Sequence, residues 1–411
     1  MPTHRERTII LLVAAVQFVN ILDFVMVMPM GPDFAAALGI PSSNLGLIGG
    51  SYTAAAAVSG LAGSLFLDRF DRRTALGVAM LGLVFGTAMG AFATGLPSLM
   101  LARVVAGIFG GPATSLSLSI VADVVPPERR GKAMGTVFGA FSVAQVIGVP
   151  AGLFFAHLFT WRAPFVGVAG IGVVVALTAV FLLPPMRGHL AAVHRSTTTF
   201  ADLAGQRMVV LSWAMTFLVM MAGFVLIPVI SPYIQFNLGY PRERLALPYL
   251  VGGCVSLVSL QVAGRATDRV GSFVVGTFGT VLLVAVSAAA FLVFPPLIGP
   301  VAIVAFFMFA MAFRNVAYNA LTSRVPALGE RARFMSIQSS VQHGASALGA
   351  FLSSRLLSEL PDHRLVGIER AAAVSIGVSL TLPFLLRAVE GGVRRREAAR
   401  TQALAPEMAA S

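Results

Sequence analysis

The amino-acid sequence predicts an all-α polytopic membrane protein with twelve transmembrane helices in two pseudo-symmetric six-helix bundles. Of its 411 residues, 57% are hydrophobic and only 11% are charged, which is too few charges for a water-facing surface. Apolar stretches of about 20 residues, each long enough to cross a bilayer, recur along the whole chain. A short charged phrase occurs twice, 200 positions apart, and the period-two alternation of a β-barrel is absent.

Twelve stretches have the length and apolarity of a membrane span. They cover roughly residues 8–31, 44–67, 74–95, 98–124, 132–157, 163–185, 208–231, 245–264, 272–295, 298–322, 334–356 and 367–387. The first apolar stretch follows a short basic segment, as the apolar segment of a signal peptide does. This stretch is longer than the apolar segment of a signal peptide, contains Asp23 and ends without an Ala-x-Ala cleavage site. These features predict an uncleaved membrane span.

The arginines and lysines are distributed unevenly between the two sides of the predicted membrane. With a cytoplasmic N-terminus, 21 of the 29 lie in segments facing the cytoplasm, 6 in segments facing outside and 2 within spans. This asymmetry is the positive-inside rule. The net charge of +12 therefore indicates topology and not a nucleic-acid partner. We expect a protein of the cell membrane with both termini in the cytoplasm.

The repeated phrase divides the chain into two similar halves. Asp68-Arg69 and Asp268-Arg269 each follow a long apolar stretch, and the same offset holds over most of each half. Two similar halves in a membrane protein are typical of a transporter that rocks about a central site.

The longest polar interruption separates these halves. We expect an N-terminal six-helix bundle over residues 1–185, a cytoplasmic linker over 186–207, a C-terminal six-helix bundle over 208–388 and a disordered cytoplasmic tail over 389–411. Within the linker, Thr199 is placed to cap a short amphipathic helix that begins at Phe200.

The sequence lacks the patterns of an enzyme or of a cofactor-binding protein. It contains no HExxH, no Gly-x-Ser-x-Gly, no P-loop and no metal-ligand cluster. Cys254 is the only cysteine, so no intramolecular disulfide forms. A membrane-embedded enzyme or receptor would need a catalytic cluster or an extramembrane domain. We therefore expect no metal, no cofactor and no enzymatic activity.

Several motifs follow one another in the N-terminal half. The loop after the second span matches Gly-x-Leu-Ala-Asp-Arg-x-Gly-Arg-Lys at Asp68, Arg69, Arg72 and Arg73, and departs from it at Ser64 and Asp71. The first span carries Asp23, the fourth carries Arg103 with Gly107, Gly110 and Gly111, and the fifth carries Gly139, Gly148, Pro150 and Gly152. Trp161-Arg162-Ala163-Pro164-Phe165 opens the sixth span.

With these motifs in this order, the chain resembles the major facilitator superfamily. More narrowly, it is similar to the twelve-span drug:proton antiporter branch, which includes arabinose and drug efflux permeases. The resemblance runs nearly from end to end. It implies the major facilitator fold, with the first and fourth spans together on the wall of a central cavity. The motif of the fifth span marks exporters in that family.

Asp23 is the only carboxylate well inside a predicted span. It lies eight residues before Gly31, about 12 Å from the outer end of the helix. Gln17 and Asn20 share its sector of the helix, which we expect to face a wet cavity. Arg103 lies at a similar depth in the fourth span. Because intramembrane ionisable groups are usually functional, we interpret Asp23 and Arg103 as a proton-coupling pair. A locked carboxylate and a static ion pair are the alternatives.

Arg314 in the tenth span has no counterpart in the first half, since position 114 is Thr. An arginine that breaks the pseudo-symmetry is a candidate for binding a substrate with an acceptor or a negative charge. A gate or a packing role is the alternative. The residues expected to line the substrate cavity are Gln17, Asn20, Gln145, Trp213, Arg314, Asn315, Tyr318 and Asn319.

The two Asp-Arg loops are interpreted as conformational latches at the inner face. The latch residues are Asp68, Arg69, Arg72, Asp123, Asp268 and Arg269. Asp68 is expected to face the start of the eleventh span, whose helix dipole favours an anion. Arg69 or Arg72 is expected to pair with Asp123. The alternative is a solvated loop that only satisfies the positive-inside rule.

The fifth span carries the antiporter motif. Gly148, Pro150 and Gly152 remove side-chain bulk and one backbone donor, so we expect a bend and a close helix contact there. Plain packing is the alternative. Gly139 belongs to the same motif.

These patterns predict a secondary active transporter that exports a small amphipathic organic compound or drug in exchange for protons, by alternating access. The alternative is a proton-coupled symporter for uptake of a sugar, an organic acid or another small metabolite. The expected partners are a small-molecule substrate, protons and the lipid bilayer. We expect a monomer.

Overall fold

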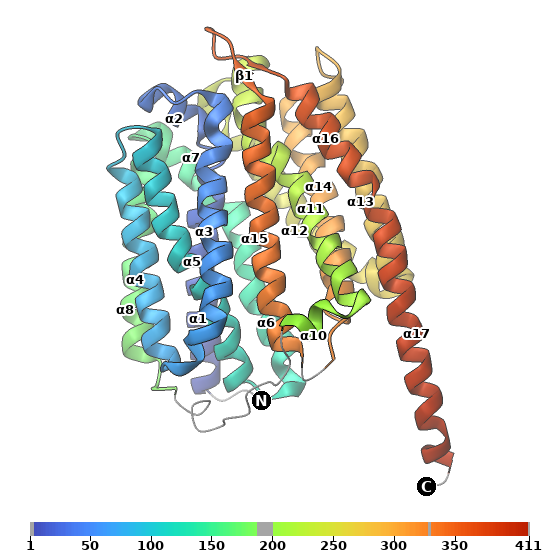
Figure 1. The fold of residues 1–411 in the computed structure, drawn as a ribbon. Coiled ribbons are helices and arrows are strands. Elements are labelled where there is room, and N and C mark those ends of the chain that lie inside the picture. The colour runs from blue at the N-terminus through green and yellow to red at the C-terminus, as the bar shows by residue number, and fades with distance from the viewer. Residues whose placement is uncertain (1–3, 187–199, 328–329, 410–411) are drawn as a thin grey trace.

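Two bundles of long helices lie side by side in the computed structural model, which describes residues 4–186, 200–327 and 330–409 (Figure 1). The N-terminal bundle contains α1 (His4–Val25), α2 (Gly31–Leu38), α3 (Leu45–Phe66), α4 (Arg72–Ala91), α5 (Leu96–Val124), α6 (Pro127–Val143), α7 (Val149–Leu158) and α8 (Ala163–Leu182). A five-residue π-helical turn, Ala144–Gly148, joins α6 to α7 within one span.

The C-terminal bundle follows the linker. It contains α10 (Phe200–Ala204), α11 (Arg207–Pro232), α12 (Ala246–Val270), α13 (Ser272–Ser287), α14 (Pro300–Thr322), α15 (Arg331–Leu356), α16 (Ile368–Leu380) and α17 (Leu382–Ala409). A two-stranded hairpin of β1 (Ser358–Glu359) and β2 (Leu365–Val366) stands between α15 and α16.

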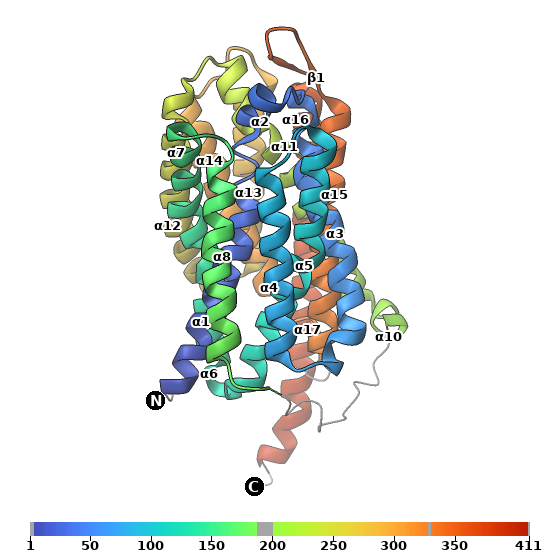
Figure 2. The ribbon, with the colours of Figure 1, turned by 90° about the vertical axis from the view of Figure 1, so that its left-hand side faces the viewer.

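The two ends of the molecule differ. Both chain termini and α10 lie at one end, which we call the inner end, while α2 and the β1–β2 hairpin lie at the outer end (Figures 1 and 2). The positive-inside rule predicts that the inner end faces the cytoplasm. The short helix expected from Phe200 is present as α10, and Thr199 lies outside the described residues.

Twelve helices in two bundles are confirmed. Eleven helical segments among the described residues are long and apolar enough to cross a membrane. The remaining span is α15, which has 26 residues but carries Gln338, Gln342 and His343. Because α15 packs against α3 of one bundle and α11 of the other, these polar side chains are at least half-buried.

The first span ends earlier than the sequence predicts. We expected it to continue to residue 31, whereas α1 ends at Val25 and the chain turns before α2. Pro29, Gly31 and Pro32 account for the difference, since proline interrupts the ladder of helical hydrogen bonds. Asp23 therefore lies in the last turn of α1, and not eight residues inside a helix.

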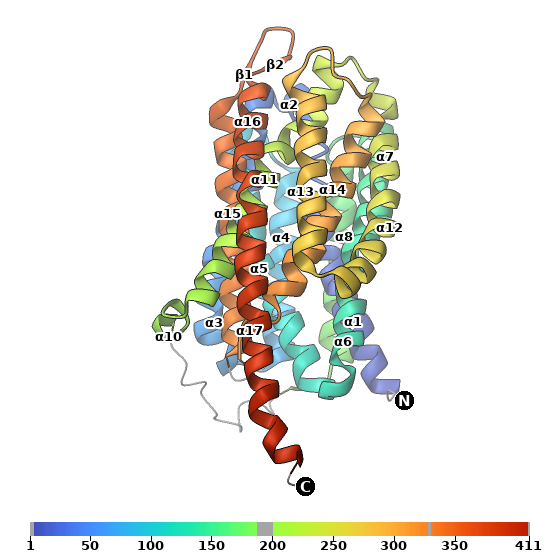
Figure 3. The ribbon, with the colours of Figure 1, turned by 90° about the vertical axis from the view of Figure 1, so that its right-hand side faces the viewer.

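We expected a disordered tail over residues 389–411, and the structure describes residues 389–409 as helical. They continue α17 from the membrane span to Ala409 (Figure 3). The segment is rich in Ala, Arg and Glu, which are strong helix formers. The carboxylate of Glu390 also accepts a hydrogen bond of 2.6 Å from Arg394, one turn further on.

Candidate functional site

The side chains of Asp23 and Arg103 form a bidentate ion pair inside the N-terminal bundle. Nη1 and Nη2 of Arg103 donate to Oδ2 and Oδ1 of Asp23, each at 3.0 Å. Nη1 also donates to the backbone oxygen of Asp23 at 3.1 Å, and so satisfies one of the last carbonyl groups of α1. The two side chains are 0% and 1% exposed.

The surroundings of the guanidinium are aromatic. The rings of Tyr52 and Phe165 lie 5.7 Å and 5.6 Å from the central carbon of Arg103. Phe24, next to Asp23 in sequence, stacks on Tyr52 and on Phe224 of the other bundle. Electrostatic interactions are strong where water is excluded, so the protonation state of Asp23 has a large effect on how firmly Arg103 is held.

Asn20 links α1 to α3 and α5 next to the pair. Its amide donates to the backbone oxygen of Gly110 at 3.1 Å and to Oγ1 of Thr114 at 2.7 Å. Its carbonyl accepts from the hydroxyl of Tyr52 at 2.8 Å. A Cβ atom on Gly110 would lie 2.2 Å from that hydroxyl, so only glycine leaves room for the contact. Asn20 is therefore committed to structural hydrogen bonds.

Thr87 of α4 completes the surroundings of the carboxylate. Its Oγ1 lies 2.7 Å from Oδ1 of Asp23 and 2.9 Å from the backbone oxygen of Leu83. Sequence reasoning missed both Thr87 and Tyr52. A single threonine or tyrosine in an apolar span gives no signal of its own, and only the packing of α3 and α4 against α1 reveals their roles.

The expected substrate residues differ from one another in burial and in contacts. Gln17 is buried and its Oε1 has no partner among the described atoms. Gln145 is half-buried in the π-helical turn, and its backbone oxygen faces Gly253 of α12. Trp213 is stacked between Phe200 and Phe334, with ring centroids 5.9 Å and 6.0 Å away. The indole thus packs α10 and α15 onto α11.

Arg314 is fully buried inside the C-terminal bundle and contacts no carboxylate among the described residues. Its Nε and Nη2 have no partner, and Nη1 lies 3.9 Å from the sulfur of Met311. Tyr318, one turn further along α14, is buried as well. Asn315 is half-buried, and its Oδ1 is buried without a partner among the described atoms. Asn319 is exposed, so its amide is the accessible one of the two.

The latch residues differ from one another in their contacts. Nε of Arg72 lies 3.3 Å from Oδ2 of Asp123, which joins α4 to α5 within the N-terminal bundle. Arg69, Asp268 and Arg269 are exposed, and the structure records no ion pair for them within its described part. The side chain of Asp68 lies outside the described residues. Each inner-end ion pair that the structure describes joins segments of the same bundle.

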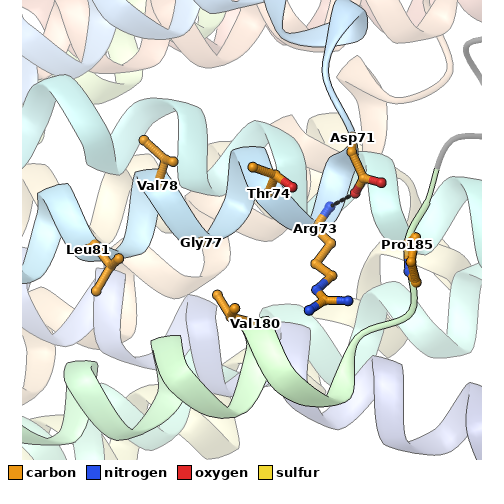
Figure 4. Close-up of a pocket in the computed structure, with 8 residues that line it drawn as sticks. All are labelled: Asp71, Arg73, Thr74, Gly77, Val78, Leu81, Val180 and Pro185. Carbon is orange, nitrogen blue, oxygen red and sulfur yellow. Dashed lines mark hydrogen bonds between the residues drawn. The ribbon is translucent and has the colours of Figure 1, made fainter.

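Asp71, which replaces a glycine of the family loop motif, caps α4. Its Oδ1 accepts from the backbone N–H of Arg73 at 2.9 Å, and its φ of −56° requires no glycine. The two residues stand at the end of a groove between α4 and α8 with a volume of about 290 Å³ (Figure 4). Val78 and Leu81 continue the groove along the outside of the bundle, away from Asp23 and Arg103.

The fifth span contains the π-helical turn Ala144–Gly148, which lies within the predicted antiporter motif. Pro150 stands directly after this turn, at the second residue of α7, and lacks the N–H of one helical hydrogen bond. A Cβ atom on Gly148 would lie 2.5 Å from Cδ1 of Leu22 in α1. Gly139 and Gly152 have no comparably close neighbour. Of the three glycines, Gly148 alone makes such a close helix contact.

The two bundles are tied together at the outer end. Nε and Nη2 of Arg242 donate to the carboxylate of Asp33 in α2 at 2.7 Å and 2.8 Å. Oγ of Ser231 donates to the backbone oxygen of Pro29 at 2.7 Å. Glu359 of the hairpin accepts a hydrogen bond from the backbone N–H of Ser42. We call these contacts the outer closure, and sequence reasoning did not find them.

Comparison with known proteins places the chain in a large group of transporters. A family model described as "Major Facilitator Superfamily" matches residues 13–350. The chain is 26% identical over 393 residues to a chloramphenicol resistance protein of Streptomyces lividans, covering 92% of this chain and 96% of that one. It is 30% identical over 281 residues to the purine ribonucleoside efflux pump NepI of Shigella sonnei, covering 67% of each.

A solved structure shows the same fold. The crystal structure of a D-xylose-proton symporter superimposes with a TM-score of 0.71, covering 91% of this chain and 96% of that one. At 16% sequence identity this similarity concerns the fold alone.

Arg242→Gln is predicted to open the outer end. It removes two charge-assisted hydrogen bonds between the bundles, which weakens the outer closure by about 2 kcal/mol, a shift of roughly 30-fold in the equilibrium. Spin labels at Ala37 and Glu243, both exposed, would report a longer distance. Arg162→Gln is the control, because Arg162 bonds within its own bundle to the backbone oxygen of Ala91. Unchanged distances in Arg242→Gln would contradict the outer closure.

Acidification is predicted to favour the closed outer end. Burial raises the pKa of the Asp33 carboxyl in the conformation described here, although the adjacent Arg242 acts in the opposite direction. A carboxyl that becomes exposed when the end opens returns toward the ordinary aspartate pKa of about 3.9 and binds its proton less readily. Proton uptake above that value therefore stabilises the closed conformation. The population with the longer spin-label distance should decrease in the wild type as the pH falls through that range. An equal response in Asp33→Asn would show that another group is responsible.

Proposed function

The chain belongs to the major facilitator superfamily, and from this premise we propose that it exports a small amphipathic organic compound in exchange for protons. The observation that carries the proposal is the buried pair of Asp23 and Arg103. Among the carboxylates of the described membrane spans, that of Asp23 is the one that is completely buried, with 0% of the residue exposed. Such a group is a natural proton carrier.

Proton binding and ion pairing at Asp23 are mutually exclusive. The ionised carboxylate holds both terminal nitrogens of Arg103 by charge-assisted hydrogen bonds. A protonated carboxyl is neutral, so it accepts weaker bonds from the guanidinium and loses the attraction between opposite charges. Since Arg103 also binds the last turn of α1 through the backbone oxygen of Asp23, loss of charge loosens α1 against α5. Protonation thus becomes coupled to helix position.

The relatives support export as the direction. One is named as a chloramphenicol resistance protein and another as a purine ribonucleoside efflux pump. Proton entry supplies about 1.4 kcal/mol per pH unit and about 2.3 kcal/mol per 100 mV of membrane potential. Either contribution is sufficient to drive a compound uphill.

The contacts between bundles support alternating access. The outer closure joins the bundles in the conformation described here, while Arg69, Asp268 and Arg269 remain exposed at the inner end. We infer that these loop residues pair between the bundles when the outer end opens, and that the two sets of contacts replace one another during the cycle.

The exposed amide of Asn319 suits an uncharged acceptor or donor on the substrate. Arg314 is shielded by contrast, and a buried guanidinium with two unpaired nitrogens is costly. We infer that a substrate carrying an acceptor or a negative charge reaches Arg314 when α14 moves, and relieves this cost.

Asp23→Asn is predicted to uncouple transport from protons. In inside-out vesicles with an imposed pH gradient, the wild type should accumulate its substrate by about tenfold per pH unit for each proton exchanged. The variant should only equilibrate it. A suitable panel contains chloramphenicol, purine ribonucleosides and amphipathic drugs.

Asp362→Asn is the matched control, since Asp362 is an exposed carboxylate of the outer hairpin that pairs with Arg364. It should accumulate substrate as the wild type does. Gradient-driven accumulation that persists in Asp23→Asn would contradict the proposal, and proton-driven movement in the opposite direction would indicate symport.

Arg314→Met is predicted to stabilise the protein and to impair transport. The substitution replaces an unpaired buried cation with an apolar side chain of similar length, so the melting temperature of the purified protein should rise. Transport of anionic members of the panel should fall by about tenfold or more, because a hydrogen bond to a charged group is lost. A lower melting temperature with normal transport would contradict both roles.

A further inference from the structure

We propose that Thr87 is the positioning residue that fixes where the proton binds on Asp23, acting as a hydroxyl switch between the two protonation states. The inference rests on the proposed role of Asp23 in proton coupling. Thr87 lies one turn before the end of α4 and is 1% exposed. Its Oγ1 is within hydrogen-bond distance of two acceptors, Oδ1 of Asp23 at 2.7 Å and the oxygen of Leu83 at 2.9 Å.

A threonine hydroxyl has one hydrogen, so it donates to only one of these acceptors at a time. When Asp23 is ionised, the hydroxyl donates to Oδ1, because a charged acceptor binds more strongly than a neutral carbonyl. When Asp23 is protonated on Oδ1, the new O–H donates to Oγ1 of Thr87. The threonine hydrogen then turns to the oxygen of Leu83. Asp23 gains one proton, and Thr87 gains and loses none.

The partners of the carboxylate determine which oxygen takes the proton. Oδ2 accepts from Nη1 of Arg103, and Oδ1 accepts from Nη2 and faces Thr87. A guanidinium has donors and no acceptor. Among the hydrogen-bond partners that the structure describes for this side chain, Thr87 is therefore the one able to accept. A proton on Oδ2 would point at a donor, whereas a proton on Oδ1 finds a partner.

The other bundle supplies a threonine with the same local geometry and no carboxylate. Thr280 of α13 is also 1% exposed, and its Oγ1 donates to the oxygen of Gly276, four residues earlier, at 2.8 Å. The bond of Thr87 to Leu83 has the same four-residue spacing. Back-bonding within a helix is thus common to both residues, and the contact with Asp23 distinguishes Thr87.

Infrared difference titration of the purified protein in lipid nanodiscs tests the proposal without a substrate. The measured signal is the C=O stretch of a protonated carboxyl group as a function of pH. Thr87→Val keeps the shape of the side chain and removes the hydroxyl. Loss of the hydroxyl removes a stronger hydrogen bond from ionised Asp23 than from protonated Asp23. The protonated form of Asp23 should therefore persist to higher pH. The midpoint should rise by about one pH unit.

Three further variants complete the test. Thr280→Val should titrate as the wild type does, because it loses only the bond to Gly276. Thr87→Ser should restore the wild-type midpoint, since it retains the hydroxyl. Thr87→Ala removes the same hydroxyl with a smaller side chain and should raise the midpoint as Thr87→Val does, so the result does not depend on one variant being stable.

Asp23→Asn separates this inference from the proposed function. If the titrating signal persists in Asp23→Asn, the proton binds elsewhere and the proposed function is wrong. If the signal disappears in Asp23→Asn but keeps its midpoint in Thr87→Val and Thr87→Ala, Asp23 is the proton site and the switch is wrong. A rise in Thr280→Val equal to that in Thr87→Val would also overturn the proposal, because it would show an effect of helix back-bonding alone.

Discussion

The buried ion pair between Asp23 and Arg103 is the interaction on which the N-terminal bundle depends. Arg103 reaches from α5 to both the carboxylate and the backbone of the last turn of α1, and its guanidinium lies against the rings of Tyr52 and Phe165 from α3 and α8. Thr87 adds α4 to the same point. Five helices therefore meet at one charge pair, and a buried charge is tolerated only while its partner is present.

The two bundles share an architecture but differ in electrostatics. The N-terminal bundle buries an arginine with a carboxylate, whereas the C-terminal bundle buries Arg314 without one among the described residues. The pair of Arg103 and Asp23 is suited to proton binding, because a proton neutralises the carboxylate of Asp23. The unpaired cation is suited to an acceptor brought by a substrate. The internal repeat thus accounts for the fold, and the differences between its copies account for the proposed division of roles.

The sequence predicted features that depend on local pattern or on charge. Apolar length revealed the twelve spans, and the cost of burying a charge singled out Asp23, Arg103 and Arg314. It could not predict contacts that arise only when distant segments meet, such as Asp33 with Arg242 or Thr87 with Asp23. The stacking of Trp213 was not predicted for the same reason, because its aromatic partners come from α10 and α15. The early end of α1 depends on two prolines within an apolar run, where hydropathy gives no signal.

The central claim is that Asp23 and Arg103 depend on each other. Thermal unfolding of wild type, Asp23→Asn, Arg103→Gln and the double variant measures this dependence most directly. Each single variant leaves a buried group without its charged partner, whereas the double variant leaves two neutral groups. The account predicts that the double variant loses less free energy of unfolding than the two single variants lose together. The difference, which is the coupling energy of the two side chains, should be about 3 kcal/mol. Additive losses would show that the two side chains act independently, and would contradict it.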